Sequence, residues 1–348
     1  MSSRRFLRIS SRYLLLLLLI LSAGCLPGKT QDSGAGIRRV AGPYALNTLT
    51  WELHNTFAPP DSSASGLPVS PAVLAADIEQ ALAQQNIAAF PPVRPRLEEP
   101  PLLLVVSPRD RIKYLDRLLL LPGLNISQVE EVENGINSLG LSSLVVRIGG
   151  LGAAYPAIVS PSLPLKTIVE ATVEEWAHQY LALRPLGFLY LLDSLGFSQD
   201  PAVITMNETL AGMISDEIGA VVYQKYNNNL DVPPAEGPDD GFDFAAEMRL
   251  TRQNVDELLA ASKVDEAEVY MEGRRLFFNS NGYRIRKLNQ AYFAFHGIYG
   301  RDPGSASPVY GQMKKLRAAS ASLAEFVSRV SAMTGYSDLE QSVEKLPR

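Results

Sequence analysis

The chain has 348 residues, of which 37 are acidic and 32 are basic, so its formal net charge at neutral pH is −5. This acidic balance argues against nucleic acid as a partner, because nucleic-acid-binding proteins present a basic surface. Cys25 is the only cysteine, which excludes an internal disulfide. The length is sufficient for one large hydrophobic core or two smaller ones.

The first 24 residues have the composition of a secretory signal. Arginines at positions 4, 5, 8 and 12 precede the apolar run 14–21, which is too short to span a bilayer comfortably. Residues 21–25 read Leu-Ser-Ala-Gly-Cys and resemble the lipobox of bacterial lipoproteins, with the leucine one residue further from the cysteine than usual. We therefore expect a lipid on Cys25 that anchors the protein at the extracytoplasmic face of the bacterial cell membrane. An uncleaved anchor and a simple cleaved signal are the alternatives.

Two segments lead from this signal to the body of the protein. Residues 25–44 are rich in glycine, serine and charge, as in a flexible tether. Residues 45–101 are expected to be helical and Pro-rich, with a short amphipathic helix around Trp51, a helix over 72–87, and a linker or brace over 91–101. The second helix is expected to bury Leu74, Ile78 and Leu82. Asp77 and Glu79 are expected on its exposed face.

Residues 102–226 are expected to form a compact α+β core. Short apolar runs predict strands, and apolar residues at helical spacing predict helices where proline, glycine or capping residues bound them. The expected strands are 102–106, 144–148 and 157–159. The expected helices are 108–120, 127–138 with Ser127 and Glu130 as a capping box, 164–183 ended by Pro185, and 207–226.

The last third of the chain is expected to be helical. Residues 227–247 have the composition of an exposed mobile loop, and residues 248–348 that of a helical subdomain. Helices are predicted over 244–278, 282–299 and 312–333. The whole chain is therefore predicted to be α+β and mainly helical, with a small strand layer and a C-terminal helical part.

The predicted helix 164–183 contains the sequence Glu174-Glu175-Trp176-Ala177-His178. Glu174 and His178 are four residues apart and share one face, which is the minimum that a single helix needs to hold a metal ion. Glu175 is offset by about 100° around the helix, so it could reach a water on the metal without binding the metal itself. A third ligand must come from elsewhere, and Glu208 near the start of the next predicted helix is the candidate.

The two helices resemble those of the gluzincin zinc metallopeptidases. In that superfamily a helix with H-E-x-x-H is followed by a helix with N-E-x-x-A, and residues 207–211 match the second motif in full. An edge strand upstream of the first gluzincin helix lines the substrate cleft, and a strand-like segment occupies that place here. The resemblance implies a zincin-like domain in which Glu175 is the catalytic base and His178 and Glu208 are metal ligands. Glu174 occupies the position of the missing histidine.

The carboxylate of Glu174 changes the charge expected for the metal site. Glu174, His178 and Glu208 would carry two negative charges where two histidines and a glutamate carry one, so the site is predicted to hold Zn²⁺, Mn²⁺ or another divalent ion. The added charge raises the pKa of a metal-activated water and lowers turnover. A weak or inactive relative is one alternative. The simplest alternatives need no metal. His178 would then be a half-buried histidine with its hydrogen bonds satisfied, and Glu174 and Glu175 would lie on a solvated acidic face.

Later residues offer further candidates for chemistry. His296, at the end of a predicted helix, is either a donor to the oxyanion of a tetrahedral intermediate, as the resemblance implies, or a histidine favoured by the helix dipole. Tyr292 and Tyr299 are alternative donors. A basic cluster either binds a substrate carboxylate or pairs with Glu268 and Glu272. The cluster consists of Arg274, Arg275, Arg284, Arg286 and Lys287.

These features predict a membrane-anchored, extracytoplasmic metallopeptidase that hydrolyses peptides by metal-activated water. Its partners would be a peptide or protein substrate and the membrane that holds its lipid. The alternative is a zincin-fold lipoprotein of little or no activity that binds a peptide or protein partner.

Overall fold

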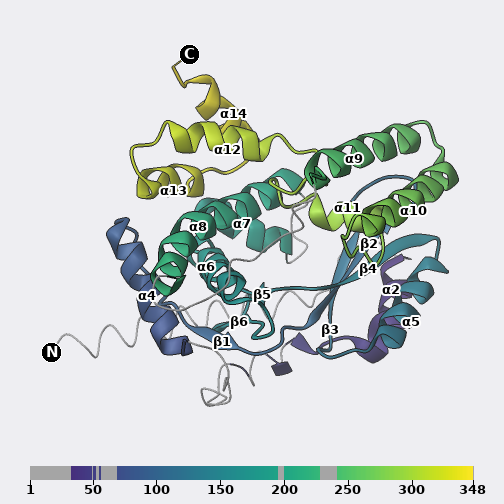
Figure 1. The fold of residues 1–348 in the computed structure, drawn as a ribbon, viewed down its shortest axis with the longest axis horizontal. Coiled ribbons are helices and arrows are strands. Elements are labelled where there is room, and N and C mark those ends of the chain that lie inside the picture. The colour runs from purple at the N-terminus through teal and green to yellow at the C-terminus, as the bar shows by residue number, and fades with distance from the viewer. Residues whose placement is uncertain are drawn as a thin grey trace.

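In the computed structural model the chain is α+β and mainly helical, with two three-stranded sheets (Figure 1). The structure describes residues 33–48, 50–51, 55, 69–194, 200–227 and 241–347. The expected signal, Cys25 and most of the expected loop 227–247 lie outside these residues, so the predictions made for them stay predictions. Within the described part, no helix is both long and apolar enough to cross a membrane.

The first sheet has the order β3-β2-β4, with β2 (Leu102–Pro108) antiparallel to both β3 (Asp116–Leu120) and β4 (Leu141–Arg147). On one face its leucines and valines pack against α2 (Ser33–Ala41) and α5 (Ile126–Asn137). On the other face Val105 and Leu144 pack against α11 (Gln290–His296). Figure 1 shows α2 and α5 outside this sheet and α11 on its inner side.

No helix forms over residues 108–120, and the last five of them form β3, so the helix predicted there is wrong. The run Leu118–Leu120 is apolar, and a short apolar run fits a helix and a strand equally well. In the structure it pairs residue by residue with β2, with Leu118 opposite Leu104 and Leu120 opposite Leu102. A distant pairing partner decides the conformation here.

Two further expectations near this sheet are corrected. The segment 25–44 was expected to be a tether, but its residues 33–44 form α2 and the short helix η1 (Gly42–Tyr44), and Ile37 and Ala41 are buried in the core with α5. Helix α5 begins one residue earlier than predicted. Its capping box is made by Asn125 and Gln128, because their side chains bond each other's backbone N–H groups.

The second sheet has the order β1-β6-β5, and β5 and β6 contact one of the two helices that carry the candidate site. Its strands are β1 (Pro95–Leu97), β6 (Ala157–Val159) and β5 (Gly150–Leu151). Part of the Pro-rich segment thus acts as a strand, since β1 pairs in parallel with β6. The short strand β5 pairs with β6 on one side only and forms an edge of the sheet.

The main hydrophobic core is helical. Helix α6 (Leu165–Leu181) packs along α8 (Pro201–Asn227), and α7 (Pro185–Ser194) and α4 (Pro71–Gln84) pack beside them. As predicted, Leu74, Ile78 and Leu82 of α4 are buried. Asp77 was expected to be exposed, but it accepts hydrogen bonds from Lys225 Nζ (2.6 Å) and Tyr226 OH (2.8 Å) at the end of α8.

The remaining helices are shorter than the three that were predicted. They are α9 (Phe244–Ala260), α10 (Val264–Ser280), α11, α12 (Val309–Ala318), α13 (Leu323–Ser331) and α14 (Tyr336–Glu344). Helices α9 and α10 form a hairpin around a third core, while α12 and α13 pack on α8. The loop from α11 to α12 therefore lies against the helices of the candidate site.

Candidate metal centre

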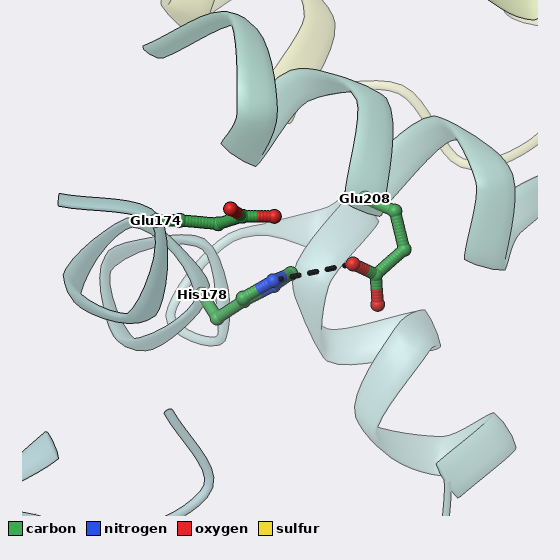
Figure 2. A group of neighbouring side chains, drawn as sticks. All are labelled: Glu174, His178 and Glu208. Carbon is green, nitrogen blue, oxygen red and sulfur yellow. Dashed lines mark ion pairs between the residues drawn. The ribbon is translucent and has the colours of Figure 1, made fainter. Parts of the chain in front are cut away.

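Three of the predicted site residues come together between α6 and α8. Ligand atoms of Glu174, His178 and Glu208 all lie within 4.8 Å of one another. Figure 2 shows Glu174 and His178 on one face of α6, with Glu208 facing them from α8. His178 Nε2 and Glu208 Oε2 are 3.4 Å apart. The predicted convergence of these three side chains is confirmed, and among the described residues no other group of three or more possible ligands was found.

Helix α8 carries an unusual number of buried polar side chains where it faces α6. Apolar residues such as Met206 and Leu210 hold the helix in the core. Between them, Asn207, Glu208 and Thr209 are 1%, 6% and 5% exposed. Burying polar groups is costly unless they find partners or a ligand. The side chains of this stretch therefore indicate a site more than a packing surface.

The imidazole of His178 is held in one orientation by two neighbours. Its Nδ1 lies 2.8 Å from Asn207 Oδ1, so a proton on Nδ1 is donated to that oxygen and Nε2 faces Glu208. The ring of Tyr190 stacks on it, with the centroids 5.7 Å apart and the planes at 16°. Such contacts fix the tautomer and direction of a metal-binding histidine.

Tyr190 also holds Glu208, because its hydroxyl donates a 2.8 Å hydrogen bond to Glu208 Oε1. One side chain on α7 therefore positions a candidate ligand from α6 and another from α8. The sequence reasoning missed it because Pro185 was interpreted only as the end of one helix, whereas it also begins α7. Proline is favoured in the first turn of a helix, and this signal could have revealed α7.

Glu175 points towards the edge strand β5. Gly150 and Gly152 lie against its carboxyl group so closely that a side chain at either position would collide with it. The backbone N–H of Gly152 donates a hydrogen bond to it. Glu175 is outside the group of converging ligand atoms but close enough to interact electrostatically with all three residues. Glu175 does not line the cavity beside Glu174 and Glu208, so the catalytic role predicted for it stays a prediction.

The side chains of the site shift one another's pKa values. Burial raises the pKa of Glu175 to about 8, and Glu174 and Glu208 add to this while His178 opposes it. Burial also raises the pKa of Glu174. Burial alone would lower the pKa of His178, but Glu208 and the two other glutamates raise it to about 10. Burial alone would raise the pKa of Glu208, yet His178 and Tyr190 hold it below its usual value. The opposite shifts of His178 and Glu208 favour an ion pair between them, whereas burial favours the neutral form of Glu174 and Glu175.

A small enclosed cavity adjoins this group. Its volume is about 10 Å³, room for the centre of about one water molecule. Its walls come from α6, α8, the loop after α11 and the start of α12. They are Glu174, Glu208, Thr209, Gly212, Tyr299, Gly300, Arg301 and Tyr310. Thr209 Oγ1 is buried and has no hydrogen-bond partner among the described residues. Arg301 forms an ion pair with Asp216.

The predicted role of His296 finds less support than that of Tyr299. The Nδ1 atom of His296 lies 2.7 Å from Asp302 Oδ2, and its ring packs on Tyr292 with centroids 4.1 Å apart. Tyr299, and not His296, is in the wall of the cavity beside Glu174. Of the candidate donors, Tyr299 is therefore the better placed.

The predicted basic cluster is divided among several acidic partners. Arg275 pairs with Glu272 at 2.6 Å, as one of the two interpretations expected, whereas Glu268 pairs with Arg109 outside the cluster. Arg274 pairs with Glu247 at 2.5 Å, and Arg286 and Lys287 pair with the buried Glu133. All of these ion pairs except the one within α10 join different elements, and only Arg284 of the cluster has no ion pair to the described residues.

Comparisons of the chain with known protein families, with curated proteins and with solved structures find no match. The resemblance to gluzincins therefore stays a prediction from the two sequence motifs.

Proposed function

We propose that this protein is a zincin-like metallopeptidase, anchored through a lipid on Cys25 at the extracytoplasmic face of a bacterial membrane, that hydrolyses peptides. The observation that carries the proposal is the convergence of Glu174, His178 and Glu208 to within 4.8 Å on two packed helices. Asn207 and Tyr190 strengthen the proposal, because they bond His178 and Glu208. Ligands that are held by further hydrogen bonds are typical of metal sites.

The donor set fits a divalent ion. Tetrahedral donors about 2.0–2.1 Å from zinc are about 3.4 Å apart. The distance from His178 Nε2 to Glu208 Oε2 is 3.4 Å. A ligand oxygen of Glu174 lies within 4.8 Å of both. Two carboxylates and one imidazole suit Zn²⁺ and also Mn²⁺, which prefers oxygen ligands.

Each residue of the site has a role in the proposed hydrolysis. A bound divalent ion would polarise the substrate carbonyl and lower the pKa of the attacking water. Glu175 would accept a proton from this water and pass it to the leaving nitrogen. Tyr299 would donate a hydrogen bond to the carbonyl oxygen as negative charge develops on it. The edge strand β5 lies beside Glu175, where an extended peptide could align.

A metal titration tests the proposal. The metal-free chain should bind one Zn²⁺ or Mn²⁺ in calorimetry, and Glu208→Ala should weaken this binding by at least about 100-fold, because a direct ligand is lost. Glu170→Ala is the matched control, since Glu170 lies one turn before Glu174 on α6 and contacts Lys166 at 3.6 Å. Equal binding by the two variants, or no stoichiometric binding by the wild type, would refute the metal site.

A second experiment separates an enzyme from a binding protein. Glu175→Gln should abolish cleavage of unfolded protein substrates and leave the metal stoichiometry unchanged. The alternative of an inactive binding protein is favoured by one observation, namely that His178 and Glu208 already pair with each other at 3.4 Å. If the metal-loaded wild type binds peptides but does not cleave them, that alternative holds.

The proposed anchor is tested separately. Cys25→Ser should move the exported protein from the membrane fraction to the soluble fraction, because the lipid attachment site is lost. An unchanged distribution would contradict lipid anchoring and would leave the metal site unaffected.

A further inference from the structure

The hydroxyl of Thr209 differs from those of the other buried threonines among the described residues. Thr172, Thr205 and Thr251 each donate a hydrogen bond to the backbone carbonyl four residues earlier, at 2.7 to 2.9 Å. A buried threonine in a helix is commonly satisfied in this way. Thr209 lies one turn after Thr205 on α8, yet its Oγ1 has no hydrogen-bond partner among the described residues. Its hydroxyl therefore does not use the bond that its own helix offers.

Thr209 borders the small cavity beside the candidate metal ligands. Thr209, Glu174 and Glu208 all belong to the wall of this cavity. The loop after α11 covers Thr209 with Gly300, where a Cβ atom would lie only 2.6 Å from Thr209 Oγ1. Because glycine has no side chain, the loop closes the cavity here without giving the hydroxyl a partner. The hydroxyl is therefore available to whatever the cavity holds.

The size and the charge of the cavity indicate its occupant. Its volume of about 10 Å³ is room for the centre of about one water molecule. The carboxylates of Glu174 and Glu208 in the wall disfavour a small anion. A buried water needs about two to four polar partners, and these carboxylates and the hydroxyl of Thr209 meet this need. A carboxylate has about four acceptor positions, so Glu208 can accept a further bond beside its contacts with Tyr190 and His178.

We propose that the cavity binds one water molecule, held by Thr209, and that this water is an additional ligand of the ion in the candidate metal centre. The first part stands without a metal, whereas the second rests on the proposed function. Two of the three candidate ligands, Glu174 and Glu208, line the cavity, so a water there lies beside the ion that they would hold. Glu175 does not line it, so the held water is distinct from the attacking water. Thr209 is thus a positioning residue of the metal site.

The held water affects which ion suits the site. The three candidate ligands and the held water provide four donors, and the attacking water makes a fifth. Structural and catalytic sites usually hold Zn²⁺ with four donors, whereas Mn²⁺ prefers six donors that are mostly oxygen. Loss of the held water should therefore weaken the binding of Mn²⁺ more than that of Zn²⁺.

The experiment compares three variants of the full chain by calorimetry with Mn²⁺ and with Zn²⁺. Thr209→Val replaces the hydroxyl by a methyl group and should bind Mn²⁺ at least about tenfold more weakly, with less than about threefold loss for Zn²⁺. Thr209→Ser keeps a hydroxyl and should stay within about threefold of the wild type for both ions. Thr205→Val is the matched control, because it removes a buried hydroxyl that bonds the carbonyl of Pro201 at 2.9 Å. It should bind both ions as the wild type does.

Thermal unfolding of the metal-free chain detects the water without any ion. A buried hydroxyl that has no partner is unfavourable, so Thr209→Val would melt above the wild type if the cavity were dry. If Thr209 holds a water, the variant loses this hydrogen bond and should melt about 2 °C below the wild type. A crystal structure of the metal-free wild type should show the water within about 3.2 Å of Thr209 Oγ1.

Three results would overturn the proposal: a dry cavity in the crystal, a higher melting temperature for Thr209→Val, or equal Mn²⁺ binding by Thr209→Val and Thr205→Val. If Thr209→Val does not fold, the crystal of the wild type decides the first part, and a large loss of Mn²⁺ binding in Thr209→Ser contradicts the second. If the wild type binds neither ion, the proposed function and the second part fail together. The water in the metal-free crystal then still decides the first part.

Discussion

Two buried acidic centres of this protein differ in how their charge is balanced. Glu133 of α5, 2% exposed, accepts hydrogen bonds from the backbone N–H of Val145 at 2.7 Å, from both terminal nitrogens of Arg286, and from Lys287 at 3.2 Å. Burial alone would raise its pKa, but these donors lower it. At the α6–α8 centre three glutamates share one histidine, and the pKa values of Glu174 and Glu175 are raised.

Glu133 is an acid that joins parts of the fold, whereas the glutamates between α6 and α8 form a candidate site. Glu133 connects α5, the first sheet and the segment before α11, and its oxygens are fully used. Among the described residues, no cation forms an ion pair with Glu174 or Glu175, and burial raises the pKa of both. A divalent cation would supply the missing charge. We therefore expect substitutions at the two centres to affect different quantities, stability at one and ligand binding at the other.

The largest expected effect is at Glu133. Glu133→Ala leaves Arg286, Lys287 and the N–H of Val145 without their acceptor, and should lower the free energy of unfolding by about 3 kcal/mol. Urea unfolding of the metal-free chain measures this. Its zinc stoichiometry should be unchanged after refolding. A loss of zinc binding in this variant would erase the distinction between the two centres.

Zinc should stabilise the wild type but not a ligand variant. At a free zinc concentration 100 times the dissociation constant, the free energy of unfolding should rise by about 2.7 kcal/mol. Glu208→Ala should show no such rise at the same concentration. Thermal unfolding with and without a chelator provides the measurement, and equal stabilisation of both proteins would place the ion elsewhere.

The third effect depends on pH. The pKa of Glu175 is about 8 in the folded chain, above its ordinary value of 4.5, so its contribution to stability is complete below 4.5 and is lost as the pH rises to about 8. Glu175→Gln carries no such proton. In the metal-free state at pH 8 it should melt about 3–6 °C above the wild type. The gap should close near pH 4.5, and a gap that is constant with pH would show that Glu175 is not the titrating group.

The smallest effect is expected at Tyr190. Tyr190→Phe keeps the ring that stacks on His178 but removes the hydroxyl that holds Glu208, and should weaken zinc binding about tenfold. Tyr226→Phe is the control, because it removes a similar 2.8 Å bond to Asp77 far along α8. If both variants bind zinc equally, Tyr190 does not position the ligand.

The site helices could be predicted from sequence because their signals are local. In α6, Val169, Val173, Trp176 and Ala177 repeat at helical spacing, and all four are buried as expected. The spacing of Glu174 and His178 followed from this helix. Their approach to Glu208 depended on the resemblance to a known pair of helices, since nothing local shows how two helices pack.

The features that were not predicted depend on contacts between distant parts of the chain. Leu118–Leu120 is a strand because β2 lies beside it. Arg117 lies in a segment expected to be helical, and only the sheet register shows that it faces the α11 side. Tyr299 was one of three candidate hydrogen-bond donors in its region. It is the one that the loop after α11 places in the wall of the cavity. A sequence pattern shows which face of one helix or strand is buried. A site built from several elements can be predicted only when the packing of these elements is known.

The wall of the small cavity has a consequence for the order of assembly. The three ligands belong to α6 and α8, whereas Tyr299, Gly300 and Arg301, which close the cavity, come from a loop far later in the chain. Helices α12 and α13 share the hydrophobic core of α6 and α8, so the cavity closes only when this late part of the chain packs. An ion that reached the candidate ligands before that step would be enclosed by the loop.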